Sequence, residues 1–152
     1  MHPCILVAAA FLAASAPLAL SVALPGPAAA TVAVPAEETA LEEAMEGIRA
    51  GMKALGKAIE TKDGETAWRS VCSLQQHLLA AKQETPMKAS SIPEGERAAW
   101  MSDFRSRISR LLQASCDVEI AILAGDHGEA GRVYEDVMWP MQKPAHEKFR
   151  ND

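Results

Sequence analysis

Apolar residues recur at alternating steps of four and three, and this spacing limits the possible folds more than any other feature. Across residues 39–61 they are Leu41, Met45, Ile48, Met52, Leu55 and Ile59. Steps of this size place apolar side chains along one face of an α-helix, the face that packs into a helical core. The pattern therefore predicts an amphipathic helix that needs helical partners.

Three further segments carry the same seam, and no segment alternates like a strand. The second helix spans residues 65–84, the third carries the seam from Met101 to Ile122, and the fourth carries Ala130, Val133, Val137 and Met141. The connections are short at 63–64, long and proline-containing at 84–96, and short at 125–126. These lengths predict an all-α protein, an antiparallel up-down-up-down four-helix bundle.

The first thirty residues differ from the rest because they contain no Asp, Glu, Lys or Arg. The apolar run 4–24 precedes Ala28 and Ala30, which fit an A-x-A cleavage site. An uncleaved membrane anchor is the alternative, but Pro17 and the small-residue exit favour cleavage. We therefore expect a signal peptide at 1–30, a flexible mature N-terminus at 31–38, a bundle at 39–152, and a periplasmic location.

Charge and motifs exclude several functions. The net charge is −5 and no basic stripe is present, so no nucleic-acid partner is expected. Once the signal is cleaved, no membrane association is expected either. Serine-protease triads, H-E-x-x-H, phosphate loops and paired Glu-x-x-His motifs are lacking. We expect a monomer that is not an enzyme.

Two cysteines remain after the signal, Cys72 in the second helix and Cys116 in the third. Each lies about seven residues from the helix end at one end of the bundle, and each follows a seam residue. An antiparallel helix pair would place them face to face, which predicts a disulfide. Two free thiols are the alternative.

The bundle topology also brings together the start of the first helix and the end of the fourth. Met45 lies near the first and His146 near the second. A thioether and an imidazole on facing helices can occupy both axial positions of a haem iron, which suits single-electron transfer. A seam methionine also serves as core packing. Pro140 and Pro144 predict a kink before His146.

Four stretches add a resemblance to this geometry: "LEEAMEGI" (41–48), "AAKQETPMK" (80–88), "WMSDFRSRI" (100–108) and "AHEKFR" (145–150). In this order and spacing the chain resembles the cytochrome b562 family. The resemblance implies a periplasmic four-helix electron-transfer protein with one noncovalent haem b (iron protoporphyrin IX), serving a periplasmic redox partner. It implies Met45 and His146 as iron ligands and Phe104 beside the haem. Gln142 stands where a cation would help a propionate, and Lys143 or Lys148 are substitutes.

Three alternatives stay open at this point. Met52 is a rival to Met45 as the ligand, although it lies two turns further along. A cluster of Met45, Met138, Met141 and His146 would suit cuprous ion in a copper-binding bundle. The third alternative is a bundle without haem that acts as an interaction or stress-sensing module.

Overall fold

The computed structural model describes residues 36–149, with side chains from residue 40, so the predicted signal peptide at 1–30 lies outside it. The described part is helical and contains no strand, which confirms the all-α prediction. Its elements are the helices α1 (Ala36–Glu60), α2 (Gly64–Gln83), α3 (Glu94–Leu123), α4 (His127–Val133) and α5 (Gln142–Phe149), with the shorter turns η1 (Met87–Ser91), η2 (Tyr134–Met138) and η3 (Trp139–Met141). None of these helices combines the length and apolar character that crossing a membrane requires.

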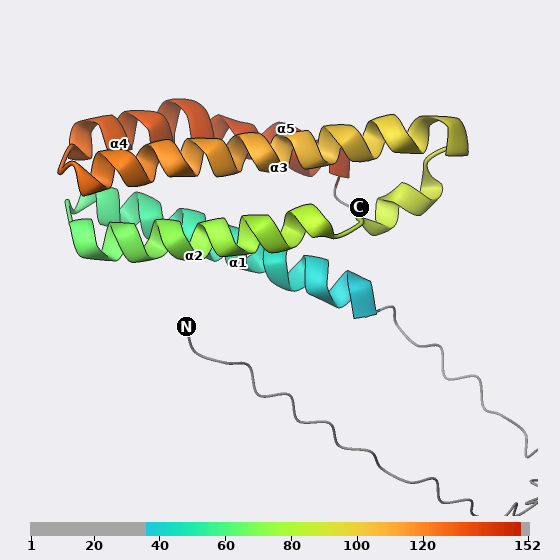
Figure 1. The fold of residues 1–152 in the computed structure, drawn as a ribbon, viewed down its shortest axis with the longest axis horizontal. Helices are drawn as coiled ribbons and strands as arrows, with labels where there is room; N and C mark the ends of the chain where they lie inside the picture. The colour runs from blue at the N-terminus through green and yellow to red at the C-terminus, as the bar shows by residue number, and fades with distance from the viewer. Residues whose placement is uncertain (1–35, 150–152) are drawn as a thin grey trace, which may run out of the picture. The chain divides into compact units, whose positions relative to one another are not determined.

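The helices form a bundle in which consecutive elements pack together, α1 on α2, α2 on α3 and α3 on α4 (Figure 1). The fourth helical segment is composite and runs through α4, η2, η3 and α5. Helix α1 begins at Ala36, three residues before the predicted start at Thr39.

Both short connections use the same turn. Lys62 and Gly125 adopt positive φ angles of 56° and 74°. In each turn the next N–H donates to the carbonyl five residues back, at 2.9 Å, which closes a Schellman motif. That next residue, Asp63 or Asp126, then accepts a backbone N–H at the start of the following helix. One dipeptide therefore ends one helix and begins the next.

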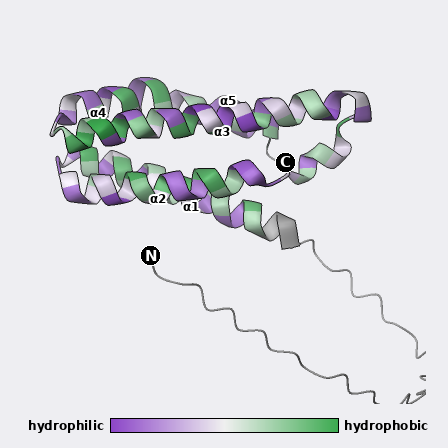
Figure 2. Ribbon diagram, in the orientation of Figure 1, coloured by the Kyte–Doolittle hydropathy of each residue, from purple (hydrophilic) through white to green (hydrophobic). Residues whose placement is uncertain are grey.

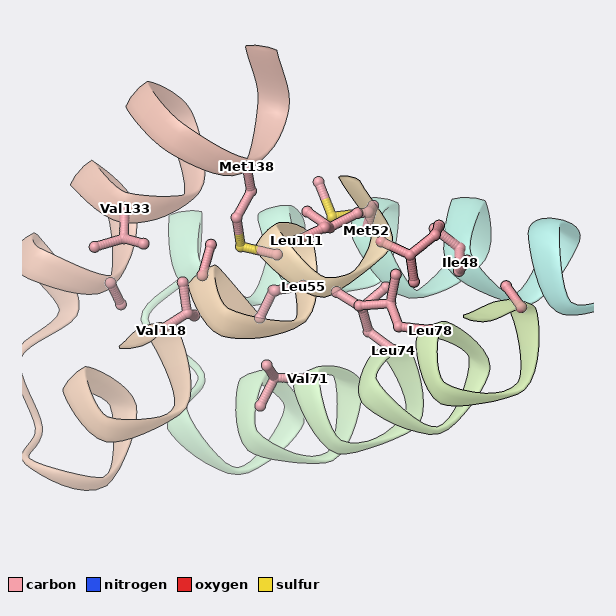
Figure 3. Close-up of a cluster of buried hydrophobic side chains, with 14 of the residues drawn as sticks. Ile48, Met52, Leu55, Val71, Leu74, Leu78, Leu111, Val118, Val133 and Met138 are labelled. Atoms are coloured by element: carbon pink, nitrogen blue, oxygen red, sulfur yellow. The ribbon is translucent and has the colours of Figure 1, made fainter. Parts of the chain in front are cut away.

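Most of the core comes from the predicted seams, but in the fourth segment Met138 is buried whereas the predicted Val137 and Met141 are half-buried. Side chains from α1, α2, α3 and the fourth segment point toward one another in Figure 3. Leu55, Leu74, Leu78, Val118 and Met138 are each 0% exposed. Hydrophobic and hydrophilic residues alternate along the helices in Figure 2, as one-sided burial requires.

Helices α1 and α2 approach closely because Gly47 and Gly51 face α2. A β-carbon at position 51 would lie 3.1 Å from Leu74 Cβ and 3.3 Å from its Cα, and one at position 47 would overlap the His77 ring. The glycine pair thus lets α2 side chains pack on the α1 backbone.

The fourth helical segment stays helical on both sides of Pro140 and Pro144. Ahead of Pro140 the backbone widens, with Trp139 N–H donating to the Tyr134 carbonyl, and after it Gln142 N–H donates to the Trp139 carbonyl. Backbone angles at the junctions stay in the right-handed helical region. Pro144 lies in the first turn of α5, where its missing N–H has no intrahelical partner to lose. The segment passes Pro140 through a π-turn followed by a 3₁₀ turn, and α5 continues beyond them.

Candidate functional site

The three residues predicted to hold the cofactor line one cavity. It has a volume of about 810 Å³ and lies between α1, α3, the start of η1 and the segment from Pro140 to Phe149. Met45 comes from α1, Phe104 from α3 and His146 from α5. Phe104 is buried, Met45 is half-buried and His146 is exposed. The sulfur and imidazole side chains therefore both lie within reach of a ligand.

On helix α5, His146 belongs to a row of residues that share one face of the helix. Gln142, Ala145, His146 and Phe149 follow the i, i+3, i+4, i+7 spacing of one helical face, and all four line the cavity. The apolar walls come from the seams of α1 and α3, namely Leu41, Ile48, Phe104, Ile108 and Leu111.

Two interactions anchor α5 to α3. Lys148 Nζ donates to Asp103 Oδ2 at 2.7 Å. The Phe149 ring packs edge-on against Trp100 and Phe104, with ring centroids 4.9 and 5.3 Å away. Phe149 was not among the predicted site residues, although its place three residues after His146 in "HEKFR" is a usable signal.

Acid should weaken this anchor. The hydrogen bond from Lys148, followed by that from Arg107, lowers the pKa of Asp103 below its usual 3.8. A lowered folded-state pKa contributes stability above the unfolded-state value and loses it as pH falls through the folded-state value. We expect Asp103→Asn to reduce the unfolding free energy at pH 7 by less than about 1 kcal/mol, since the pair is partly exposed.

Urea unfolding of both proteins at a series of pH values measures this effect. The difference between wild type and Asp103→Asn should shrink as the pH falls below 3.8, the usual pKa of the carboxyl. A difference that stays constant across the series would show that the carboxylate charge does not carry the anchor.

Polar groups interrupt the apolar lining. Arg49, Arg107 and Arg110 border the cavity, together with Gln142 and the carboxylates of Glu42 and Glu46. Gln142 Nε2 is buried and has no hydrogen-bond partner within residues 36–149. An unpaired buried amide costs about 1–3 kcal/mol. A ligand that accepts a hydrogen bond there would remove this cost.

Four of the other methionines, Met52, Met138, Met87 and Met141, differ in which cavity they line. Met52 is 2% exposed and lines a second cavity of about 840 Å³ beside Lys53 and Tyr134, so it does not share the cavity of His146. Met138 is buried in the core and lines neither of the two cavities, which removes it from the predicted copper cluster. Met87 and Met141 line the His146 cavity with Met45.

The predicted disulfide is wrong. Cys72 and Cys116 are free thiols, half-buried and exposed respectively. Cys72 Sγ donates to Glu119 at 3.8 Å, whereas Gln75 donates to Cys116 Sγ at 3.8 Å and to Glu119 at 2.8 Å. Cys72 thus lies opposite Glu119, and Cys116 opposite Gln75. The cysteines share a flank but are three residues out of register, just under one turn, or about 4.5 Å along the axis. Partial burial, and then Glu119, raises the pKa of the Cys72 thiol.

Residues 40–149 contain no group of three or more His, Cys, Asp or Glu side chains able to hold a metal ion. His77 packs on Gly47, and His127 lines neither cavity.

No protein-family model matches the chain, and a search of curated proteins found no match. Functional inference rests on the cavity, its side chains and the motifs described above.

Proposed function

We propose that the chain is a periplasmic electron-transfer protein that binds one noncovalent haem b between Met45 and His146. The observation that carries this proposal is the shared cavity, because Met45, Phe104 and His146 lie far apart in the sequence yet line the same space. Thioether and imidazole are axial ligands of haem iron in electron-transfer proteins. The resemblance of the four quoted motifs to the cytochrome b562 family supports the same assignment.

The residues present fit such a cofactor. A volume of about 810 Å³ falls in the range of cofactor pockets, and the walls are apolar. The unpaired Gln142 amide supplies a donor that a cofactor carboxylate can satisfy. Met45 and His146 would hold the iron, and Phe104 with Phe149 would shield one side from water.

A bound haem with both axial positions filled supplies reversible one-electron transfer between ferric and ferrous iron. This chain's own residues bind the cofactor, orient it and exclude water. The up-down-up-down order, the exported location and a monomer serving a redox partner belong to the same proposal. The two short turns and the packing of consecutive helices support that order.

Absorption spectroscopy of the purified protein titrated with hemin and then reduced with dithionite tests the proposal. We expect one equivalent to bind and a sharp low-spin α-band to develop. His146→Ala should lose that band and weaken hemin binding by more than about tenfold, because even the partners of a metal ligand contribute that much.

His127→Ala is the matched control, since His127 lines neither cavity. It should leave both the affinity and the low-spin spectrum unchanged. A wild-type protein that binds no hemin, or binds it equally well without His146, would refute the haem assignment.

One observation favours a second candidate, a cuprous ion. Met45, Met87, Met141 and His146 all line the cavity, and soft thioethers with one imidazole suit that ion. Copper binding would depend on Met87 and Met141, whereas haem ligation would not. Titration of Met87→Leu and Met141→Leu with cuprous ion and with hemin therefore separates the two.

A further inference from the structure

We propose that Arg110 and Gln142 form a carboxylate-binding edge of the cavity and so orient its ligand. The inference rests on the proposed function, because it adds which groups of a haem this chain recognises and where they lie. It identifies the ligand class as an apolar body with carboxylates along one edge.

The three arginines at the cavity differ in whether their N–H donors are already paired with a carboxylate. Arg49 pairs with Glu46 at 2.6 Å, and Arg107 pairs with Asp103 at 3.1 Å and lies over the Phe149 ring. Arg110 has no ion pair or hydrogen bond within the described residues. Arg110 is thus the guanidinium whose donors are uncommitted at the cavity wall. A guanidinium binds a carboxylate with two parallel hydrogen bonds.

Gln142 supplies the second donor, and the missing hydrogen-bond partner of its side-chain amide points to a ligand. Its Nε2 is buried without an acceptor, although Gln142 lines the cavity. Folding leaves such a group unpaired only at a cost in free energy, which a ligand oxygen at this position would remove. The side chain is therefore ready to donate.

Polar groups along the two ligand-bearing helices set the direction. Gln142 lies one turn before His146 on α5, and Arg49 one turn after Met45 on α1. Arg49 and Gln142 also line the second cavity, so they mark the junction, the place where the two cavities meet. In the opposite direction, α1 presents Glu42 and α5 presents Phe149. The Gln142 amide favours a carboxylate on the junction side, and Glu42 repels one in the opposite direction. Arg49 adds little, because Glu46 already pairs with it. A haem, which carries both propionates on one edge, should point that edge toward the junction.

Hemin and hemin dimethyl ester, whose propionates carry no charge, are the probes for this proposal. Arg110→Gln should weaken hemin binding about tenfold, as the loss of one charged hydrogen-bonded contact predicts, and leave ester binding unchanged. The low-spin spectrum should persist, because the iron ligands are untouched. Arg105→Gln is the matched control, since Arg105 is exposed on the same helix and does not line the cavity.

Gln142→Leu gives an independent readout. It removes an unpaired buried amide, so the ligand-free protein should melt at the same or a higher temperature while hemin binding weakens several-fold. A residue with a merely structural role would lower the melting temperature. Wild-type hemin affinity in both variants, or equal loss of hemin and ester binding, would overturn the carboxylate edge.

Metal-free protoporphyrin IX separates this inference from the proposed function. Porphyrin binding that is sensitive to Arg110→Gln, without a low-spin band in hemin, would keep the carboxylate edge and remove the Met45 and His146 ligation. A low-spin band that is insensitive to Arg110→Gln would do the reverse.

Discussion

Replacing Leu78 by alanine should lower the free energy of unfolding by about 3 kcal/mol, the usual cost of emptying a buried leucine site. Leu78 is 0% exposed and belongs to the cluster drawn in Figure 3. Alanine at this position loses the transfer free energy of the side chain and leaves a cavity that the surrounding helices fill only in part. Urea denaturation followed by circular dichroism measures the change.

The neighbouring Leu79 provides the control, because it is 48% exposed on the same helix. Leu79→Ala should change stability by no more than about 0.5 kcal/mol. Equal costs at the two positions would mean that α2 is rotated relative to the core described above. The pair thus tests the helix face independently of any cofactor.

Gly51→Val should destabilise the protein by about 2–3 kcal/mol through overpacking. A β-carbon at this position already meets the Leu74 backbone at 3.3 Å, and the two further methyl groups of valine need more room. Helix propensity acts in the opposite direction, since valine is a better helix former than glycine by roughly 0.3 kcal/mol. A loss of stability in Gly51→Val would therefore indicate overpacking between the helices, whereas a gain would indicate helix propensity alone.

Ala54→Val controls for the β-branched side chain, because Ala54 is exposed on the same helix. It should cost about 0.5 kcal/mol, the propensity term alone. If Gly51→Val were neutral or stabilising, α1 and α2 would not approach as closely as described. Thermal unfolding of both variants beside wild type would decide.

Much of the fold could be predicted because burial repeats with the period of the helix. The seam residues of α2, from Ala67 to Ala81, are the buried residues of that helix. The turn at Gly125 and Asp126 was also predictable, since glycine suits the positive φ and aspartate the N-cap. These are local effects, and the amino acids that produce them are adjacent in the chain.

Register between helices was not predictable in the same way. Cys72 and Cys116 were correctly placed on one flank of the α2–α3 pair but at the wrong relative height. An error of one turn is enough to exclude a disulfide. Counting residues from helix ends does not resolve one turn, because loop geometry and side-chain packing set the offset between helices.

The candidate site shows the same difference between what local sequence predicts and what helix packing decides. Met45, Phe104 and His146 were chosen from motifs and spacing, and they line one cavity. The positions of Met138 in the core and of Arg110 at the cavity were not predictable. Which face of α5 meets the bundle depends on the π-turn before Pro140 and on the contact of Phe149 with Trp100.

The sequence by itself determined the helical class, the core face of α2 and the turn at Gly125 and Asp126, because each depends on neighbouring residues and on a period of 3.6. Only the tertiary structure decided which side chains from different helices share a space. It left the cysteines unpaired, excluded Met52 and Met138 from the His146 cavity, and brought Arg49 and Arg110 to its lining. Those outcomes depend on interhelical offsets of a single turn, which arise from the packing of all the helices together.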